Sequence, residues 1–269
     1  MDEDIRLAVS PRHTIRLAQE YAILVQKPQR RDFVVRTIAK REANGNPLMS
    51  AEIVIAGAET RERFPLAVEY PLHFRKTYFP GRLHGDPKHE FDRQGDAHRL
   101  IATPPPIGWA EREFRTCLLP GVPYSSLSPF RAEPIEANIR HTRDVPLATA
   151  AGLYRLAEDA FAKLRALQDG GLAHGDAELH NFVVCPAPLE IVPIDFEGAL
   201  TKDTLADEDW EKRCKIDLVP LLRHTVLLEC CLGEQSGPLA DLAKERMNEL
   251  FKEPDRFRRE IERRADLGG

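Results

Sequence analysis

Short apolar runs rich in β-branched residues mark the first part of the chain. Runs at residues 33–38 and 52–56 predict two strands, and Asn44-Gly45 between them is a turn signal. A third run, from Val68 to Phe79, alternates apolar and polar positions and predicts another strand. The pattern therefore predicts a small sheet near the amino-terminal end.

Helical spacing of apolar residues precedes this sheet and dominates the second part of the chain. Residues 12–25 predict a short amphipathic helix by this spacing. A second helix is expected over residues 89–100, where the proline run at residues 104–106 ends it. The clearest pattern runs from Ala148 to Gln168, where apolar residues recur at steps of three and four. Two charge-rich helices are expected over Pro238 to Phe251 and Asp255 to Ala265.

One stretch combines a polar loop with a predicted hairpin, and it reads LAHGDAELHNFVVCPAPLEIVPIDFEGAL. Residues 182–184 and 191–192 are short apolar, β-branched runs, and the proline-rich segment between them predicts a turn. Because the two open ends of a hairpin lie side by side, we expect Asn181 and Asp195 at the same end.

The polar residues of this stretch suit phosphoryl transfer, which needs positioning and charge neutralisation more than covalent chemistry. Magnesium prefers oxygen ligands and usually takes one or two carboxylates together with substrate phosphates. The side chains of Asn181 and Asp195 can supply such ligands. A separate carboxylate must accept or orient the proton of the attacking hydroxyl, and Asp176 fits that role.

The order HGDAELHN followed by IDFE resembles the catalytic loop and the metal-binding loop of the protein-kinase-like phosphotransferases. The form His174-Gly175-Asp176 is similar to the loop of an atypical, bacterial-type branch: aminoglycoside phosphotransferases and lipopolysaccharide core kinases. The short carboxy-terminal part is similar to those core kinases and to RIO-like kinases. The resemblance implies His174 and Asp176 as catalytic residues, and Asn181 and Asp195 as ligands of Mg2+.

The resemblance also implies a fold class: an α+β, two-lobed protein-kinase-like fold with a small antiparallel-sheet N-lobe and a mainly helical C-lobe. The expected N-lobe spans residues 1–118 and covers the nucleotide. The expected C-lobe spans residues 119–269 and carries the catalytic and metal-binding loops. ATP and Mg2+ would lie between the lobes.

A lysine and an acid are expected to steady the nucleotide's phosphates. Lys76, in the third predicted strand, resembles the strand lysine that contacts the α- and β-phosphates in kinases. Arg75 points to the opposite face of that strand and is the competing choice. Glu90 and Asp96 are both candidates for the helix acid that pairs with this lysine, while Gln94 occupies the position in one possible register.

The loop over the phosphates and the adenine-binding strand match the family less closely. Kinases cover the phosphates with a glycine-rich loop, whereas this chain has only Gly45 in the first predicted hairpin. Either Asn44 and Gly45 form a degenerate loop, or the phosphates are covered differently. Backbone groups from Cys117 to Leu119 are expected to hydrogen-bond the adenine edge.

Several acids depart from the protein-kinase pattern or extend it. Glu197 replaces the glycine of the metal-binding loop, as in kinases of small molecules, and only a short segment separates Asp195 from Asp217. That segment leaves little room for a peptide-cradling activation loop. Asp217 resembles the aspartate that braces the catalytic loop, with a helix N-terminal acid as the alternative. The resemblance implies that Glu178, two residues after Asp176, lies near the transferred phosphate, and we expect it to bind an amino group on the acceptor.

Composition narrows the partners and the compartment. With a net charge of −5 and a pI near 6.0, the 269-residue chain lacks the basic footprint of a nucleic-acid-binding protein. Its five cysteines form no CxxC pair and suit a reducing compartment. No apolar run is long enough for a signal peptide or a transmembrane segment, so a cytoplasmic location is expected.

The sequence thus predicts an ATP- and Mg2+-dependent phosphotransferase that moves the γ-phosphate to a hydroxyl of a small molecule, a glycan or a protein. One alternative is a pseudokinase, a nucleotide-binding or interaction protein that retains the fold; the degenerate loop favours it. Another is a kinase-like enzyme that transfers AMP, because a reoriented nucleotide would tolerate the altered loop.

Overall fold

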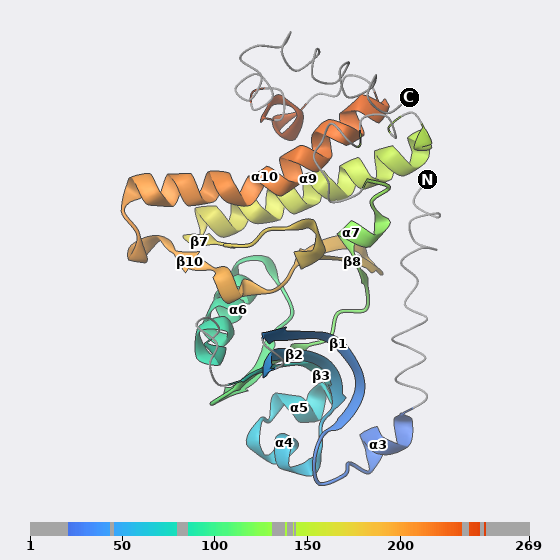
Figure 1. Ribbon diagram of the computed structural model, residues 1–269, viewed down its shortest axis with the longest axis vertical. Helices are drawn as coiled ribbons and strands as arrows, with labels where there is room; N and C mark the ends of the chain where they lie inside the picture. Colours follow the sequence, from blue (N-terminus) through green and yellow to red (C-terminus); the bar gives the residue numbers. More distant parts are fainter. Residues whose placement is uncertain are drawn as a thin grey trace.

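The computed structural model describes residues 21–43, 46–79, 86–130, 138, 142, 144–232, 237–242 and 245. A five-stranded antiparallel sheet forms the first part of the molecule (Figure 1). In spatial order its strands are β1 (Phe33–Ala43), β2 (Asn46–Ile55), β3 (Leu72–Tyr78), β5 (Glu113–Cys117) and β4 (Pro106–Ala110). The two strands predicted at residues 33–38 and 52–56 are therefore confirmed, and both are longer than expected.

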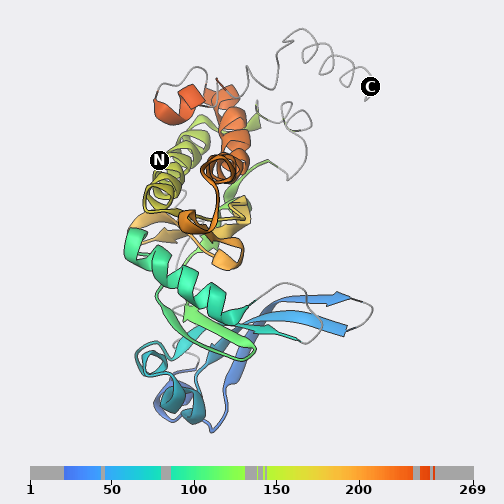
Figure 2. The same cartoon turned by 90° about the vertical axis from the view of Figure 1, so that its left-hand side faces the viewer.

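The two faces of this sheet are covered by different helices. The helix α6 (Pro87–Ile101) places Phe91 against the face formed by Met49, Ala51 and Phe114. The short helices α4 (Ala58–Arg63) and α5 (Leu66–Glu69) follow β2, and Phe64 between them packs on the opposite face. Figure 2 shows the β1–β2 hairpin reaching past the other strands, since β2 pairs with β3 only from Met49 onward.

The second part of the molecule is built on two long helices, α9 (Leu147–Asp169) and α10 (Asp207–Leu232), which lie side by side (Figure 1). Their apolar faces enclose the largest buried cluster, which includes Leu153, Leu164, Leu221, Leu228 and Phe182. Burial of such side chains stabilises the fold by about 1.5–3 kcal/mol each.

Small strands connect these helices to the sheet-rich part. The hairpin of β8 (Phe182–Pro186) and β9 (Leu189–Pro193) is joined by β6 (Val122–Pro123) and packs on α9. The two-residue strands β7 (Leu172–Ala173) and β10 (Leu200–Thr201) pair with each other. Short helical segments complete this part: α7 (Tyr124–Leu127), η2 (Leu179–Asn181), η3 (Phe196–Gly198) and η4 (Lys202–Thr204).

The predicted fold class, α+β with a small antiparallel-sheet lobe and a mainly helical lobe, is confirmed. The helices predicted at residues 89–100 and 148–168 are present as α6 and α9, and the predicted hairpin is present as β8 and β9. Within the described residues, no helix has the length and apolar character needed to cross a membrane.

The third predicted strand began too early. Val68 lies in α5, and the strand starts at Leu72, because the turn from Pro65 to Tyr70 places Ala67 in the apolar cluster under α4. The sequence pattern also gave no sign of α4 or β4. Two predicted helices lie mostly or wholly outside the described residues: 238–251 is described only at 238–242 and 245, and 255–265 not at all.

The first predicted helix, at residues 12–25, is described only from Tyr21. Within that range Ala22–Gln26 is helical (α3). The remainder of this prediction lies outside the described residues.

Candidate active site

The imidazole of His174 supports the loop from inside the protein. His174 follows β7, is 1% exposed, and lies between the rings of Phe182 and Phe196 at centroid distances of 6.2 and 4.7 Å. Its Nε2 donates to the carbonyl oxygen of Ile194 at 3.0 Å, and its Nδ1 accepts from the backbone N–H of Asp176 at 3.3 Å. Burial lowers the pKa of His174 to about 4, so the ring is neutral.

This geometry corrects the prediction that grouped His174 with Asp176 as catalytic. Both ring nitrogens of His174 are engaged inside the protein, and the side chain does not reach the solvent. His174 is therefore a positioning residue of the loop that carries Asp176.

Gly175 allows the loop to turn and to touch two other segments. Its φ of +87° favours glycine, and a Cβ here would lie 1.8 Å from the carbonyl oxygen of Gly198. The Gly175 N–H donates to Oδ1 of Asp217 at 2.9 Å, and the Arg213 guanidinium donates to the Gly175 carbonyl. Asp217 lies well inside α10, so it is not a helix N-terminal acid, and its hydrogen bond holds the loop of residues 174–176.

We expect Asp217→Asn to remove part of the pH dependence of stability. Burial raises the pKa of the Asp217 carboxyl from its ordinary 3.8 to about 6, in spite of the Gly175 hydrogen bond. Between these values the unfolded chain ionises this group while the folded protein keeps it protonated. Stability therefore falls as pH rises through this window, by about 3 kcal/mol in total, and the variant escapes this loss.

Denaturant unfolding of Asp217→Asn, from about pH 4 to 7, measures this slope against wild type. Asp209→Asn, at an exposed position of the same helix, is the matched control and should keep the wild-type slope. Equal slopes in all three proteins would contradict the prediction.

Asp176 and Asn181 are held together at the end of the loop. The Asn181 side-chain amide donates to the Asp176 backbone oxygen at 2.9 Å and to Asp176 Oδ2 at 3.1 Å. Asn181 is buried, whereas Asp176 is exposed. The Asp176 carboxylate is therefore accessible to a substrate hydroxyl, and any metal contact of Asn181 falls to its Oδ1.

The β8–β9 hairpin places Asn181 and Asp195 at the same end, as predicted. Phe182 pairs with Pro193, and the Ile194 N–H donates to the Asn181 carbonyl oxygen at 2.8 Å. Asp195 comes next and adopts a left-handed conformation, with φ 64° and ψ 68°. This conformation turns the chain out of the strand, and the Asp195 carboxylate reaches the lysine of β3.

The buried Lys76 pairs with three carboxylates, of which Glu90 is buried and Asp195 and Glu197 are partly exposed. Its Nζ lies 3.2 Å from Glu90 Oε1, 2.8 Å from Asp195 Oδ1 and 2.7 Å from Glu197 Oε2. These contacts join β3, α6 and the segment after β9, which are distant in sequence. The structure thus brings Lys76, Glu90 and Asp195 together, and it adds Glu197.

The charges in this cluster depend on one another. Burial by itself lowers the pKa of Lys76, but the neighbouring carboxylates, Glu90 first, outweigh burial and raise it well above its ordinary value. Burial opposes ionisation of Asp195 as well, yet Lys76 lowers the pKa of that carboxyl. Burial raises the pKa of Glu90 to about 7 in spite of Lys76. Lys76 and Asp195 therefore form a charged pair.

Glu197 is the member of this cluster that the sequence analysis did not place in the site. Oxygens of Glu90, Asp195 and Glu197 lie within 4.8 Å of one another, close enough to share one cation. Hard oxygen donors of this kind fit Mg2+. The signal in the sequence is an acid two residues after Asp195, at the position where protein kinases have glycine.

The structure selects between the two candidate acids of α6. Glu90 pairs with Lys76, whereas Asp96 pairs with Arg93 at 2.9 Å and with Arg99. The prediction of Asp96 as a nucleotide-site residue is therefore corrected, because it lies almost two turns further along the helix. Gln94, at the third position considered, donates to Thr103 and Pro104 at the helix end.

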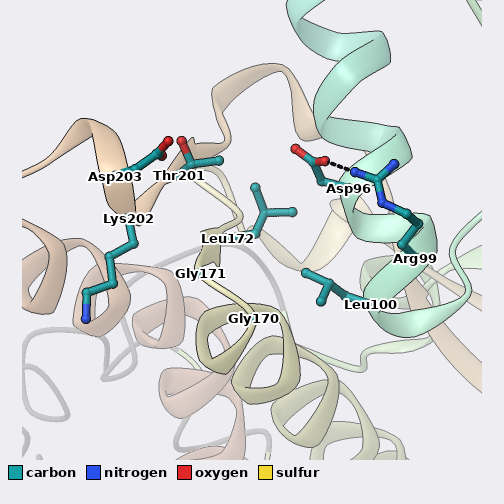
Figure 3. A pocket seen from close by; sticks show the side chains of 9 residues that line it. All are labelled: Asp96, Arg99, Leu100, Gly170, Gly171, Leu172, Thr201, Lys202 and Asp203. Carbon is teal, nitrogen blue, oxygen red and sulfur yellow. Dashed lines mark hydrogen bonds and ion pairs between the residues drawn. The ribbon is translucent and has the colours of Figure 1, made fainter.

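Asp96 instead lines a separate hollow of about 400 Å³ (Figure 3). This hollow lies between the end of α6, the turn after α9, and β10 with η4. Its lining residues are Asp96, Arg99, Leu100, Gly170, Gly171, Leu172, Thr201, Lys202 and Asp203. None of the Lys76 cluster is among them, so the hollow is distinct from the candidate active site.

Arg75, the competitor of Lys76, faces away from the cluster. Its guanidinium pairs with Asp32 at 3.1 Å and with Glu52 at 2.6 Å, on the sheet face covered by α4 and α5. Arg115 also pairs with Asp32 there, at 2.7 Å. Alternation along β3 thus separates a structural charge network from the candidate active site.

The backbone groups predicted to bind adenine are already hydrogen-bonded within the protein, and the residue predicted to cover the phosphates is not described. The Cys117 side chain packs on the α4 and α5 face, and its N–H donates to Pro105 at 3.2 Å, so this amide is already engaged. Leu119 packs beside the hairpin residues Val183 and Val192, and its carbonyl accepts from a nearby N–H. Gly45, like Asn44, lies outside the described residues.

Comparisons with known proteins give structural similarity only. No protein-family model matches the sequence, and neither does any curated protein. The chain is similar to a Rio2 kinase–ADP/Mg2+–phosphoaspartate complex from Chaetomium thermophilum, with 15% identity and a TM-score of 0.47 over 84% of this chain and 64% of that one. It is also similar to the BubR1 kinase domain, with 11% identity and a TM-score of 0.48 over 76% and 62%. It spans less than two thirds of either chain, and similarity at this level says nothing about activity.

Proposed function

We propose that this chain is an ATP- and Mg2+-dependent phosphotransferase of the protein-kinase-like type. The observation that carries the proposal is the Lys76–Glu90 pair of the first lobe meeting Asp195 of the second at 2.8 Å. The Asp176–Asn181 pair lies on the loop that leads into the same hairpin. The lobes proposed here are residues 1–118 and 119–269.

The charge and exposure of each residue suggest a separate role for it in binding the nucleotide and Mg2+. The Lys76 ammonium would contact the α- and β-phosphates, held in place by Glu90. Asp195 and Asn181 Oδ1 would hold Mg2+, and Glu197 offers a further carboxylate. When bound, Mg2+ supplies neutralisation of the phosphate charge.

Asp176 is the proposed acceptor of the substrate proton. Its exposed carboxylate can orient a hydroxyl for attack on the γ-phosphorus, while the Asn181 amide holds the carboxylate by a hydrogen bond to Oδ2. An oxygen–phosphorus bond forms to the acceptor, the bond to the bridging oxygen of ADP breaks, and the hydroxyl proton passes to Asp176. The acceptor class stays open: a hydroxyl of a small molecule, a glycan or a protein.

Calorimetric titration of wild type and Asp195→Ala with ATP, with and without Mg2+, tests the proposal. Three acids surround one buried lysine here (Glu90, Asp195 and Glu197), so phosphates should bind only with Mg2+. We expect wild type to bind ATP in a Mg2+-dependent way and to hydrolyse it slowly, and Asp195→Ala to lose the Mg2+ dependence. Asp203→Ala, which removes an exposed acid further along, is the matched control.

The same preparation separates the rival functions. A wild-type protein that binds no nucleotide at millimolar concentration would be a kinase-shaped interaction protein. Where turnover occurs, the mass gained by an acceptor is about 80 Da for phosphate and about 329 Da for AMP. A gain of the larger mass would show that the protein transfers AMP and not phosphate.

A further inference from the structure

The strand β3 holds the acid of α6 with two side chains. Lys76 Nζ donates to Glu90 Oε1 at 3.2 Å, and the hydroxyl of Tyr78 donates to the other oxygen, Glu90 Oε2. Lys76 and Tyr78 are two residues apart and therefore lie on the same face of the strand. All three side chains are buried, with residue exposures of 3%, 4% and 1% for Lys76, Tyr78 and Glu90. Both oxygens of the acid are thus engaged by one strand.

The second donor matters because the lysine is shared. Asp195 and Glu197 lie closer to the Lys76 ammonium, at 2.8 and 2.7 Å, than Glu90 does. A buried carboxylate that lost its donors would be costly, and Lys76 must also reach phosphate in the proposed reaction. The Tyr78 hydroxyl is uncharged, so a bound phosphate does not draw it away from Glu90 as it would draw the Lys76 ammonium. The hydroxyl can therefore stay hydrogen-bonded to Glu90 while Lys76 exchanges a carboxylate for phosphate.

The first turn of α6 is also hydrogen-bonded to the segment that follows Asp195 and Glu197. His89, next to Glu90, uses Nε2 to donate to the carbonyl oxygen of Ala199 at 3.1 Å. Ala199 directly follows the 3-10 turn that contains Glu197. The Tyr78 and His89 contacts therefore hold the helix turn of Glu90 from two sides, one on β3 and one after β9.

We propose that Tyr78 is a positioning residue of the nucleotide site: its hydroxyl fixes the carboxylate of Glu90, and through Glu90 it fixes the ammonium of Lys76. This inference rests on the proposed function for its kinetic consequence. The hold on Glu90 itself is a property of the protein without nucleotide, and it is tested separately.

Tyr78→Phe removes the hydroxyl and keeps the ring that packs with Met49 and Phe114. Tyr154→Phe is the matched control, because it removes a hydroxyl that donates to Glu229 at 3.4 Å in the helical part. We expect Tyr78→Phe to weaken Mg2+-dependent ATP binding about tenfold, since a buried hydrogen bond to Glu90 is lost. Tyr154→Phe should bind as wild type does.

A double-mutant cycle shows whether Tyr78 acts through Glu90. In a Glu90→Met background, which lacks the acceptor, Tyr78→Phe should weaken ATP binding no further. Equal losses in the wild-type and Glu90→Met backgrounds, or wild-type affinity in Tyr78→Phe, would overturn the inference and leave the proposed function intact. A lower melting temperature with unchanged ATP affinity would also overturn it.

Amide hydrogen exchange without nucleotide makes the test independent of activity. We expect the amides of the first two turns of α6 to exchange at least about fivefold faster in Tyr78→Phe than in wild type or Tyr154→Phe. If wild type binds no ATP, the proposed function fails. The exchange rates of the α6 amides then still test whether the Tyr78 hydroxyl holds Glu90 in place. Wild-type exchange rates in Tyr78→Phe would overturn it.

Discussion

Asp176→Asn is expected to bind Mg2+ and ATP as wild type does and to lose phosphoryl transfer by about a thousandfold. The Asp176 carboxylate is exposed on the loop of residues 174–176, and none of the three ion pairs given for Lys76 involves it. An asparagine oxygen can still accept from the Asn181 amide, so the loop geometry should be kept. An amide cannot accept the hydroxyl proton, and loss of a positioned base typically costs about 10²–10⁴-fold.

Calorimetry for ATP affinity and steady-state turnover for rate separate these two effects. Asp169→Asn, an exposed acid at the end of α9, is the control that changes the same charge away from the site. A rate within a fewfold of wild type in Asp176→Asn would remove Asp176 from the proposed mechanism. A loss of ATP affinity would instead show that the variant disturbs the loop.

Gly175→Ala is expected to destabilise the protein by about 3 kcal/mol or more and to abolish turnover. A Cβ at Gly175 would lie 1.8 Å from the carbonyl oxygen of Gly198 and 2.3 Å from its carbonyl carbon. Both are backbone atoms, so the loop of residues 174–176 and the segment after Asp195 must move apart. The positive φ of Gly175 adds strain of about 1–2 kcal/mol.

Gly171→Ala separates the strain from the clash. Gly171 also has a positive φ, +80°, but a Cβ there would meet no atom closer than the Lys202 Cβ at 3.8 Å. We expect this variant to lose only about 1 kcal/mol in denaturant unfolding and to keep turnover. Similar losses in the two variants would contradict a close approach of the two loops at Gly175.

The local pattern of residues in the sequence was enough to predict the hairpin and the strand on which the candidate site residues lie. The hairpin between Asn181 and Asp195 was predicted from two β-branched runs, because a turn of a few residues leaves little freedom in how its strands pair. Alternation along β3 placed Lys76 and Arg75 on opposite faces, and the structure puts them there. These predictions depend on neighbours in sequence, where periodicity and chain geometry constrain the answer.

Other predictions failed where a contact joins distant segments. The sequence left Glu90 and Asp96 open, because helical spacing alone does not say which face of α6 meets β3. It grouped His174 with Asp176, since burial between Phe182 and Phe196 is invisible in the motif. It also started the third strand too far upstream, at Val68, where packing under α4 decides the turn.

By itself the sequence determined the order of loop, hairpin and acid, the α+β class, and the residue types suited to phosphates and Mg2+. Only the tertiary structure decided that Glu90 pairs with Lys76, that Glu197 joins Asp195 on the same ammonium, and that Tyr78 holds the other side of Glu90. The physical reason is distance along the chain. Lys76 and Asp195 are brought to 2.8 Å by the packing of α6 between the two lobes, and no local rule of spacing encodes that contact.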